Sequence, residues 1–168
     1  SYSTRVGNGP FPTELTGDDI FLKHDLAREF GATTGRKRRI GWLDLVLIKR
    51  AVEINGINSL ALTKLDILDS VKEIKVCVAY KQEAKLLQTP PNFVEDYEGL
   101  EPIYETLQGW EAPTHEIKQY GKLPQKAQDL INFIEDYCSV KVDIVSVGPS
   151  REATFSKPRL IKEELSSS

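Results

Sequence analysis

Apolar residues alternate between helical and strand-like spacing along this chain, and that alternation limits the possible folds more than any other feature. From Leu43 to Ile54 they recur at i, i+3, i+4, i+8 and i+11, which predicts a largely buried helix ending at Asn55-Gly56. A further helix is predicted to begin at Pro124, with an apolar stripe from Ala127 to Cys138. Strand-like runs lie at residues 59–63, 74–80 and 140–145. Strands joined by helices predict an α/β fold with a mostly parallel sheet flanked by helices.

Three other segments give weaker signals. The run from Tyr2 to Val6 is typical of a short strand, and Gly7-Asn8-Gly9-Pro10 after it predicts a turn. Acidic residues after Thr16 predict the start of a helix that runs to Phe30. Prolines and glycines punctuate residues 81–124, where we expect short strands and loops with Trp110 as an anchor.

The segment Glu29–Asp44 is richer in chemistry than the rest of the chain. Its three glycines let the backbone turn and approach a ligand closely, and Thr33 and Thr34 place two hydroxyls and two N–H groups side by side. Four basic residues follow: Arg36, Lys37, Arg38 and Arg39. Hydroxyls and amides beside guanidinium groups suit carboxylates and phosphates, because the guanidinium fork matches two acceptor oxygens. The dipole of the helix predicted to follow also favours anions.

Two other interpretations of the basic run stay open. Such runs are common in solvated turns, and they also occur in patches that bind nucleic acid or direct nuclear import. The paired threonines and spaced glycines favour the anion site, since a solvated basic run does not need them. The formal net charge of −3 argues against a general nucleic-acid binder.

The composition indicates an ordinary globular protein whose 168 residues suffice for one domain with a sizeable core. No apolar stretch approaches the roughly 18 residues of a membrane span, and no signal peptide is visible. Cys77 and Cys138 lie far apart without a metal-ligand motif, so we expect no metal site and a reducing cytoplasm. His24 and His115 have no nucleophile or second ligand near them in the sequence, and we expect ordinary histidines.

Residues 64–66 suggest a base-recognition element. A short apolar run ends in Thr63-Lys64-Leu65-Asp66, which resembles the guanine-specifying element of GTP-binding proteins. Guanine presents N1–H and an N2 amino group as parallel donors, and one carboxylate can accept both, whereas adenine has no donor at N1. The lysine can lay its aliphatic stem over the purine face. Thr63 stands where the small GTPases carry asparagine, and a surface lysine–aspartate pair remains the alternative.

Several segments together resemble adenylosuccinate synthetase, the enzyme that joins IMP and L-aspartate using GTP. The central one is Gly31-Ala32-Thr33-Thr34-Gly35-Arg36 with Gly41-Trp42-Leu43-Asp44, which resembles the aspartate-binding loop of that family. The others are 5–7 with 9–14, 62–66, 75–80, 102–106 and 146–149. The resemblance covers about residues 1–155 in the family's order and spacing. This family carries threonine at the position of Thr63, so the difference from the asparagine of small GTPases agrees with the resemblance.

The resemblance implies roles for particular residues. Thr33 and Thr34 would bind the aspartate carboxylates, Arg36 would bridge aspartate and the IMP ribose, and Arg38 would reach towards GTP and aspartate. The backbone at Val6 would contact the IMP ribose. The implied substrate-binding set for aspartate and IMP is Val6, Ala32, Thr33, Thr34, Gly35, Arg36, Lys37 and Arg38. The implied GTP-binding set is Arg38, Lys64, Leu65, Asp66, Ser146, Val147 and Gly148, the last three facing guanine from the side opposite Asp66.

The resemblance also implies that this chain is the C-terminal part of a longer enzyme with a fold like that of the P-loop nucleotide hydrolases. The chain starts at Ser1, contains no methionine and has no Gly-rich phosphate loop. We therefore expect the catalytic residues and the Mg²⁺ ligands to lie outside it, and we expect the isolated chain to be inactive. The tail at residues 156–168 has no clear core pattern and is expected to be partly disordered.

The resemblance implies IMP, L-aspartate and GTP as partners, a homodimer at full length, and neither nucleic acid nor membrane as a partner. A non-catalytic module that binds guanine nucleotides or anions is the alternative from another functional class. The presence or absence of a phosphate loop and a catalytic aspartate upstream in the gene would discriminate between the two.

Overall fold

The computed structural model describes residues 1–15 and 38–158, so the helix expected up to Phe30 lies outside the described residues. The α-helices are α2 (Leu45–Asn55) and α3 (Gln125–Cys138). The strands are β1 (Ser3–Arg5), β2 (Arg39–Gly41), β3 (Leu43–Asp44), β4 (Ser59–Leu62), β5 (Glu73–Gln82), β6 (Lys85–Leu87), β7 (Glu101–Gln108), β8 (Lys141–Ser146) and β9 (Thr154–Ser156). Short 3₁₀ turns are η2 (Asp66–Leu68), η3 (Glu95–Tyr97), η4 (Tyr120–Lys122) and η5 (Arg151–Ala153).

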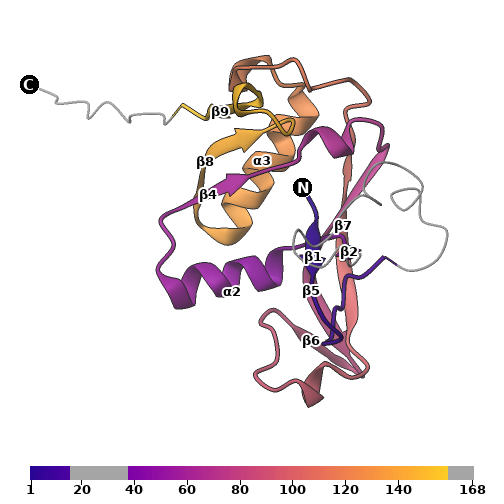
Figure 1. The fold of residues 1–168 in the computed structure, drawn as a ribbon. Helices are drawn as coiled ribbons and strands as arrows, with labels where there is room; N and C mark the ends of the chain where they lie inside the picture. The colour runs from indigo at the N-terminus through magenta and orange to yellow at the C-terminus, as the bar shows by residue number, and fades with distance from the viewer. Residues whose placement is uncertain (16–37, 159–168) are drawn as a thin grey trace, which may run out of the picture.

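The α/β class is confirmed, but the strands pair in both senses instead of forming a mostly parallel sheet. Strand β3 pairs parallel with β5, and β4 pairs parallel with β8. The pairs β1–β2, β5–β6, β5–β7 and β8–β9 are antiparallel. The physical reason is that β5, β6 and β7 follow one another without a helix between them, and strands joined by short connections return antiparallel. Figure 1 shows β5 and β7 running side by side, with β6 at their lower end.

Helix α2 ends where the sequence predicted. Gly56 is its C-cap in the left-handed conformation, at φ 60°, and the Gly56 N–H donates to the carbonyl of Val52. The prediction that this helix is largely buried is wrong for the described residues. Leu45 and Val46 are buried, whereas Leu47 and Ile54 are 36% and 64% exposed. The apolar face is present, but no described element covers its outer part.

Helix α3 buries the predicted stripe. Its buried apolar residues are Ala127, Leu130, Ile131, Ile134 and Cys138. They join the main core together with residues of β4 and β8, and Figure 1 shows α3 behind these two strands. Cys77 and Cys138 are both buried free cysteines. Trp110, the expected anchor, is buried in the same core.

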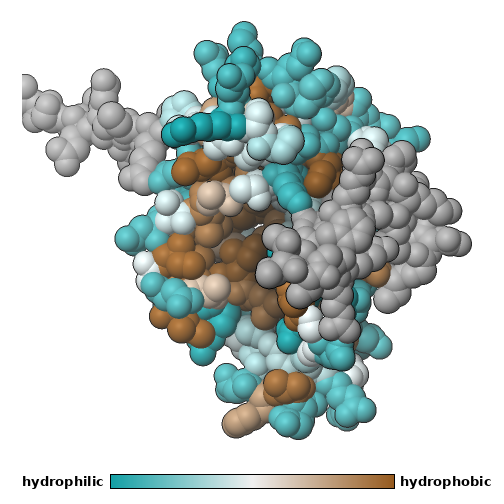
Figure 2. All heavy atoms as spheres, in the orientation of Figure 1, coloured by the Kyte–Doolittle hydropathy of each residue, from teal (hydrophilic) through white to brown (hydrophobic). Residues whose placement is uncertain are grey.

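The opposite, front side of this region is apolar and open. Figure 2 shows hydrophobic residues gathered between α2 and the β4–β8 strands. Ile144 of β8 is 42% exposed, in addition to Leu47 and Ile54 of α2. No helix in the described part of the chain is both long and apolar enough to cross a membrane.

Strand β9 could not be predicted from the sequence, because three residues carry no periodicity. The strand pairs with β8 through Ile144 opposite Ser156 and Ser146 opposite Thr154. The expected boundary between domain and tail, after residue 155, therefore falls inside a strand.

Candidate functional site

The carboxyl ends of β4 and β8 bring two predicted segments together. These strands are parallel neighbours, with Leu62 opposite Val145, so residues 64–66 and 146–148 leave the sheet at the same edge. The backbone N–H of Leu65 donates to the carbonyl of Ser146 at 3.0 Å. Segments some 80 positions apart in the sequence thus form one surface, which is the place where ligands bind in parallel α/β sheets.

Lys64 sits at a strained position on this edge. Its φ of 56° lies in the left-handed region, which is uncommon for lysine. Its ammonium group donates to the Tyr2 hydroxyl at 2.8 Å and lies 5.4 Å from the centre of the Tyr2 ring. The backbone geometry and the contact with Tyr2 together fix the direction of the lysine stem.

Asp66 carries an unsatisfied polar atom. Its Oδ1 is buried and has no hydrogen-bond partner among residues 1–15 and 38–158. Burial raises the pKa of this carboxyl, and the charge of Asp69 adds to the rise. The backbone N–H of Asp66 itself, the N-terminal ammonium and Lys64 oppose it. An unpaired buried carboxylate oxygen is costly, so such an atom calls for a partner that the described chain does not supply.

Asp69 was not singled out from the sequence, yet it fixes the turn that follows Asp66. Its carboxylate accepts from the Trp110 indole N–H at 2.8 Å, and from the Thr114 backbone N–H and hydroxyl at 2.7 and 2.8 Å. The turn η2 is thereby tied to the loop after β7. Only long-range contacts reveal this role, because Thr114 lies 45 positions from Asp69.

The turn after β8 is closed by its own groups. The Ser146 hydroxyl donates to the carbonyl of Gly148 at 2.9 Å, and the Val147 N–H donates to the carbonyl of Ala153. A side chain at position 148 would lie 3.2 Å from the Ala153 methyl group, so the turn packs tightly there. Ser146 and Val147 are buried, which leaves the partly exposed Gly148 as the residue of this turn that can face a ligand.

Tyr2 lies between three residues of the predicted site. Burial, followed by the negative charge of Asp66, raises the pKa of Tyr2 to about 12, and the positive charge of Arg38 acts in the opposite direction. Lys64 donates to the Tyr2 hydroxyl directly. The structure therefore brings Arg38, Lys64 and Asp66 around one tyrosine. Tyr2 was predicted only as a strand residue, since nothing in the local sequence indicates its long-range partners.

The turn after β1 lies on the neighbouring two-stranded sheet. Strand β1 pairs antiparallel with β2, so residues 3–5 run beside residues 39–41. Val6 then protrudes with 76% of its surface exposed, and Gly7 takes the left-handed φ of 85° that the predicted turn needs. The other predicted members of the substrate-binding set, residues 32–37, lie outside the described residues.

Of the basic run, only Arg38 and Arg39 lie among the described residues. Arg39 pairs with the carboxylate of Glu14. The N-terminus of α2, which the dipole argument offered to a ligand anion, is already capped by Asp44, whose carboxylate accepts from the Leu47 N–H at 3.1 Å. That part of the prediction is wrong, because a buried carboxylate of the chain itself occupies the position.

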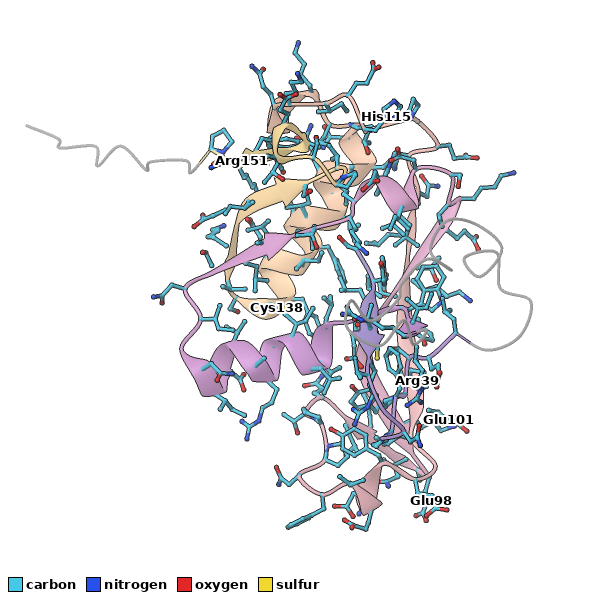
Figure 3. The ribbon with its side chains drawn as sticks, viewed as in Figure 1. Arg39, Glu98, Glu101, His115, Cys138 and Arg151 are labelled. Atoms are coloured by element: carbon cyan, nitrogen blue, oxygen red, sulfur yellow. The ribbon has the colours of Figure 1, made fainter. Side chains whose placement is uncertain are left out.

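His115 follows Thr114, which donates to Asp69, but its own side chain is 65% exposed beside Glu116 (Figure 3). His24 lies outside the described residues. Within the described ranges, no group of three or more histidine, cysteine, aspartate or glutamate side chains lies close enough to hold a metal ion.

Comparison with known proteins agrees with the sequence motifs. The family model of adenylosuccinate synthetase matches residues 1–155. An adenylosuccinate synthetase of Proteus mirabilis (strain HI4320) is 51% identical over 159 residues, which is 92% of this chain but 36% of that relative's length. The structure of a fully ligated adenylosuccinate synthetase from Plasmodium falciparum superimposes with a TM-score of 0.87 at 38% identity, covering 94% of this chain and 38% of that one. The chain thus spans little more than a third of the relatives that it matches.

Proposed function

Because the chain belongs to the adenylosuccinate synthetase family, we propose that it supplies guanine and substrate recognition to a GTP-dependent ligase of purine biosynthesis. In the proposed reaction, GTP phosphorylates O6 of IMP, which converts a poor leaving group into phosphate. The amino group of L-aspartate then displaces that phosphate at C6 and yields adenylosuccinate, GDP and phosphate. The residues of this chain bind and orient the reactants.

The observation that carries the proposal is the buried Oδ1 of Asp66 at the shared edge of β4 and β8, which has no hydrogen-bond partner in the described part of the chain. A guanine ring presents parallel N1–H and N2–H donors, which a carboxylate can accept together. In this proposal the stem of Lys64, held by Tyr2, covers the purine face. The backbone of Ser146–Gly148 contacts O6 of guanine. Adenine offers no donor at N1, so the same carboxylate selects against it.

The remaining assignments follow the family motifs. Val6 lies exposed where its backbone can meet the IMP ribose, and Arg38 lies close enough to Tyr2 to affect its pKa. We propose Ala32, Thr33, Thr34, Gly35, Arg36 and Lys37 as the aspartate- and IMP-binding loop, with Thr33 and Thr34 on the aspartate carboxylates. The proposal further includes a cytoplasmic homodimer.

We propose that the Mg²⁺ ligands of the ligase lie outside this sequence, since the described residues hold no group of three or more histidine, cysteine, aspartate or glutamate side chains placed for a metal ion. The phosphoryl transfer is assigned to groups outside this sequence. The isolated chain should therefore show no ligase turnover, and turnover by this chain alone would contradict the assignment.

The first test is calorimetric titration of this chain with GDP and, separately, with ADP. We expect binding of GDP but not of ADP, and the Asp66→Ala variant should lose at least about tenfold in affinity, since hydrogen bonds to a charged group are worth roughly 1.5–3 kcal/mol. Asp136→Ala is the matched control, because it removes an exposed aspartate of α3.

If this chain binds neither nucleotide, the same titration is made with the protein encoded by the full gene, and that result tests the guanine pocket. Equal affinity for GDP and ADP there, or an unchanged affinity in Asp66→Ala, would overturn the guanine pocket. Selective binding without any IMP-dependent turnover by the full protein would instead favour a non-catalytic guanine-nucleotide module.

A further inference from the structure

The guanidinium group of Arg39 has several hydrogen-bond partners within the described chain. Its Nε donates to Glu14 Oε1 at 2.7 Å, and its Nη2 donates to Glu14 Oε2 at 2.5 Å. Its Nη1 donates to two backbone carbonyls, that of Gly7 at 3.1 Å and that of Gly9 at 2.6 Å. Four of the five N–H donors of a guanidinium therefore have partners within the chain. Such a group is poorly suited to bind a further anion.

The two carbonyls belong to the turn that presents Val6. This turn projects from the end of β1, and its Val6 side chain is largely exposed. Arg39 lies on β2 directly opposite Arg5, so its side chain reaches the turn from the paired strand. Figure 3 shows Arg39 beside these strands. The guanidinium thus connects β2 to the turn through the turn's own backbone.

The carboxylate of Glu14 holds the guanidinium in the orientation that this contact needs. A bidentate pair fixes the plane of the fork, and the Phe11 ring lies 5.6 Å from the guanidinium carbon. Backbone hydrogen bonds fix the position of Glu14 itself. The Glu14 N–H donates to the carbonyl of Phe11, and the Leu15 N–H donates to the carbonyl of Ile40. A lysine at position 39 could not make this arrangement, since its ammonium is a point charge without a planar fork.

We propose that Arg39 is a positioning residue that sets the Val6–Gly9 turn for contact with the nucleoside monophosphate. The proposal rests on the function assigned above. Arg39 acts through the backbone of the turn and does not touch the substrate. Its partner Glu14 restrains the guanidinium, so the pair acts as one unit. Removing the fork should loosen the contact with the nucleotide ribose while leaving guanine recognition at Asp66 intact.

The test uses the full protein with the Arg39→Lys and Glu14→Gln substitutions, measured by steady-state kinetics. We expect Arg39→Lys to raise KM for IMP about tenfold, the effect of losing one charge-assisted hydrogen bond, with KM for GTP changed less than about twofold. Glu14→Gln should shift KM for IMP in the same direction by a smaller factor. Arg50→Lys is the matched control, because Arg50 pairs with Glu53 on the exposed face of α2, away from the β1–β2 strands.

Selectivity between substrates separates positioning from a purely structural role. General destabilisation would raise KM for IMP and for GTP together, and would lower the thermal midpoint in step with activity; that result would overturn the proposal. Unchanged KM for IMP in both variants would overturn it as well. Should Arg39→Lys fail to fold, Glu14→Gln alone decides by the same comparison. If the unsubstituted full protein shows no IMP-dependent turnover, the proposed function fails and this inference fails with it.

Discussion

At the scale of single residues, Asp44 forms hydrogen bonds to three elements of the fold. Its side chain is 1% exposed, caps α2 through the Leu47 N–H and accepts from the Tyr80 hydroxyl at 2.6 Å. Its own N–H donates to the Ser3 hydroxyl oxygen at 3.2 Å. One buried carboxyl thereby links β1, α2 and β5. The sequence placed Asp44 at the end of the substrate loop, but its partners come from distant strands.

Asp44 should give the protein a pH-dependent stability of unusual sign. Burial raises the pKa of its carboxyl, and the bonds from Tyr80 and Leu47 only partly oppose this. Since the folded-state pKa lies above the unfolded one, the carboxyl stabilises the fold below about pH 4, and this contribution declines as the pH rises through the folded-state value. Asp44→Asn keeps the shape and cannot ionise. We expect the variant to become more stable relative to wild type as the pH rises from 4 to 7, so that its free energy of unfolding minus that of wild type increases.

Urea titrations at several pH values measure this difference. Asp96→Asn, at an exposed aspartate, is the control and should show no such trend. A difference between Asp44→Asn and wild type that does not change with pH would show that the carboxyl titrates alike in the folded and unfolded states.

Between elements, Glu135 is the main polar connection of the upper part of the fold. It is 6% exposed on α3, and its Oε1 accepts from the Val142 N–H of β8 at 2.8 Å. The ammonium groups of Lys141 and Lys157 lie 3.3 and 2.9 Å from its carboxylate oxygens. Burial alone would raise the pKa of Glu135, but the Val142 N–H and the two lysines outweigh it and lower the pKa. Lys157, just after β9, is thereby held against α3.

Replacing Glu135 with glutamine should weaken the packing of α3, β8 and β9 together. We expect a loss of about 2 kcal/mol, because the variant leaves two lysines without a buried counter-charge while keeping one acceptor oxygen. That loss corresponds to a thermal midpoint lowered by roughly 4–8 °C for a domain of this size. The lowered pKa means that the stabilisation is present above the ordinary glutamate pKa and is lost as the pH falls, so the difference should shrink in acid. Thermal unfolding followed by circular dichroism measures it.

The exposed Glu98 provides the control for that measurement, since Glu98→Gln changes charge by the same amount without a buried partner (Figure 3). Equal midpoints for Glu135→Gln and Glu98→Gln at neutral pH would contradict a stabilising role for the buried carboxylate.

The sequence predicted the elements that carry strong periodicity and missed those set by pairing. Helix α3 and strand β5 have apolar positions at regular spacing, so their existence could be predicted from local residues. Strand β9 and the antiparallel partners of β5 depend on contacts across the chain, which periodicity does not encode. At the site, Lys64, Asp66 and Ser146 were predicted through motifs. Tyr2, Asp69 and the pairing of Arg39 were not, because each depends on partners brought together by the fold.

At the scale of the whole molecule, the face in Figure 2 carries an apolar area that the described residues leave exposed, and the burial prediction for α2 failed on this helix. Periodicity shows that α2 has an apolar face, but only the tertiary structure shows what covers it. Leu47 and Ile54 of α2 remain exposed, and so does Ile144 of β8. The apolar area that Figure 2 shows between α2 and the β4–β8 strands is therefore available for contact with another surface.

This exposed apolar area should make the chain of 168 residues associate with itself when studied alone. Ile54→Lys and Ile144→Lys place charges at two exposed apolar positions of α2 and β8 without touching buried residues, so we expect them to reduce concentration-dependent association and the fluorescence of a bound hydrophobic dye by at least about half. Leu86→Lys is the matched control, because Leu86 is 62% exposed on β6, at the far lower end of the molecule in Figure 1. Sedimentation velocity over a range of concentrations measures the effect. Association that survives the double substitution, or that Leu86→Lys abolishes equally, would place the contact elsewhere on the surface. In the protein encoded by the full gene, the same double substitution should instead lower the thermal midpoint if further chain packs on this side, since two charges would then be buried without partners.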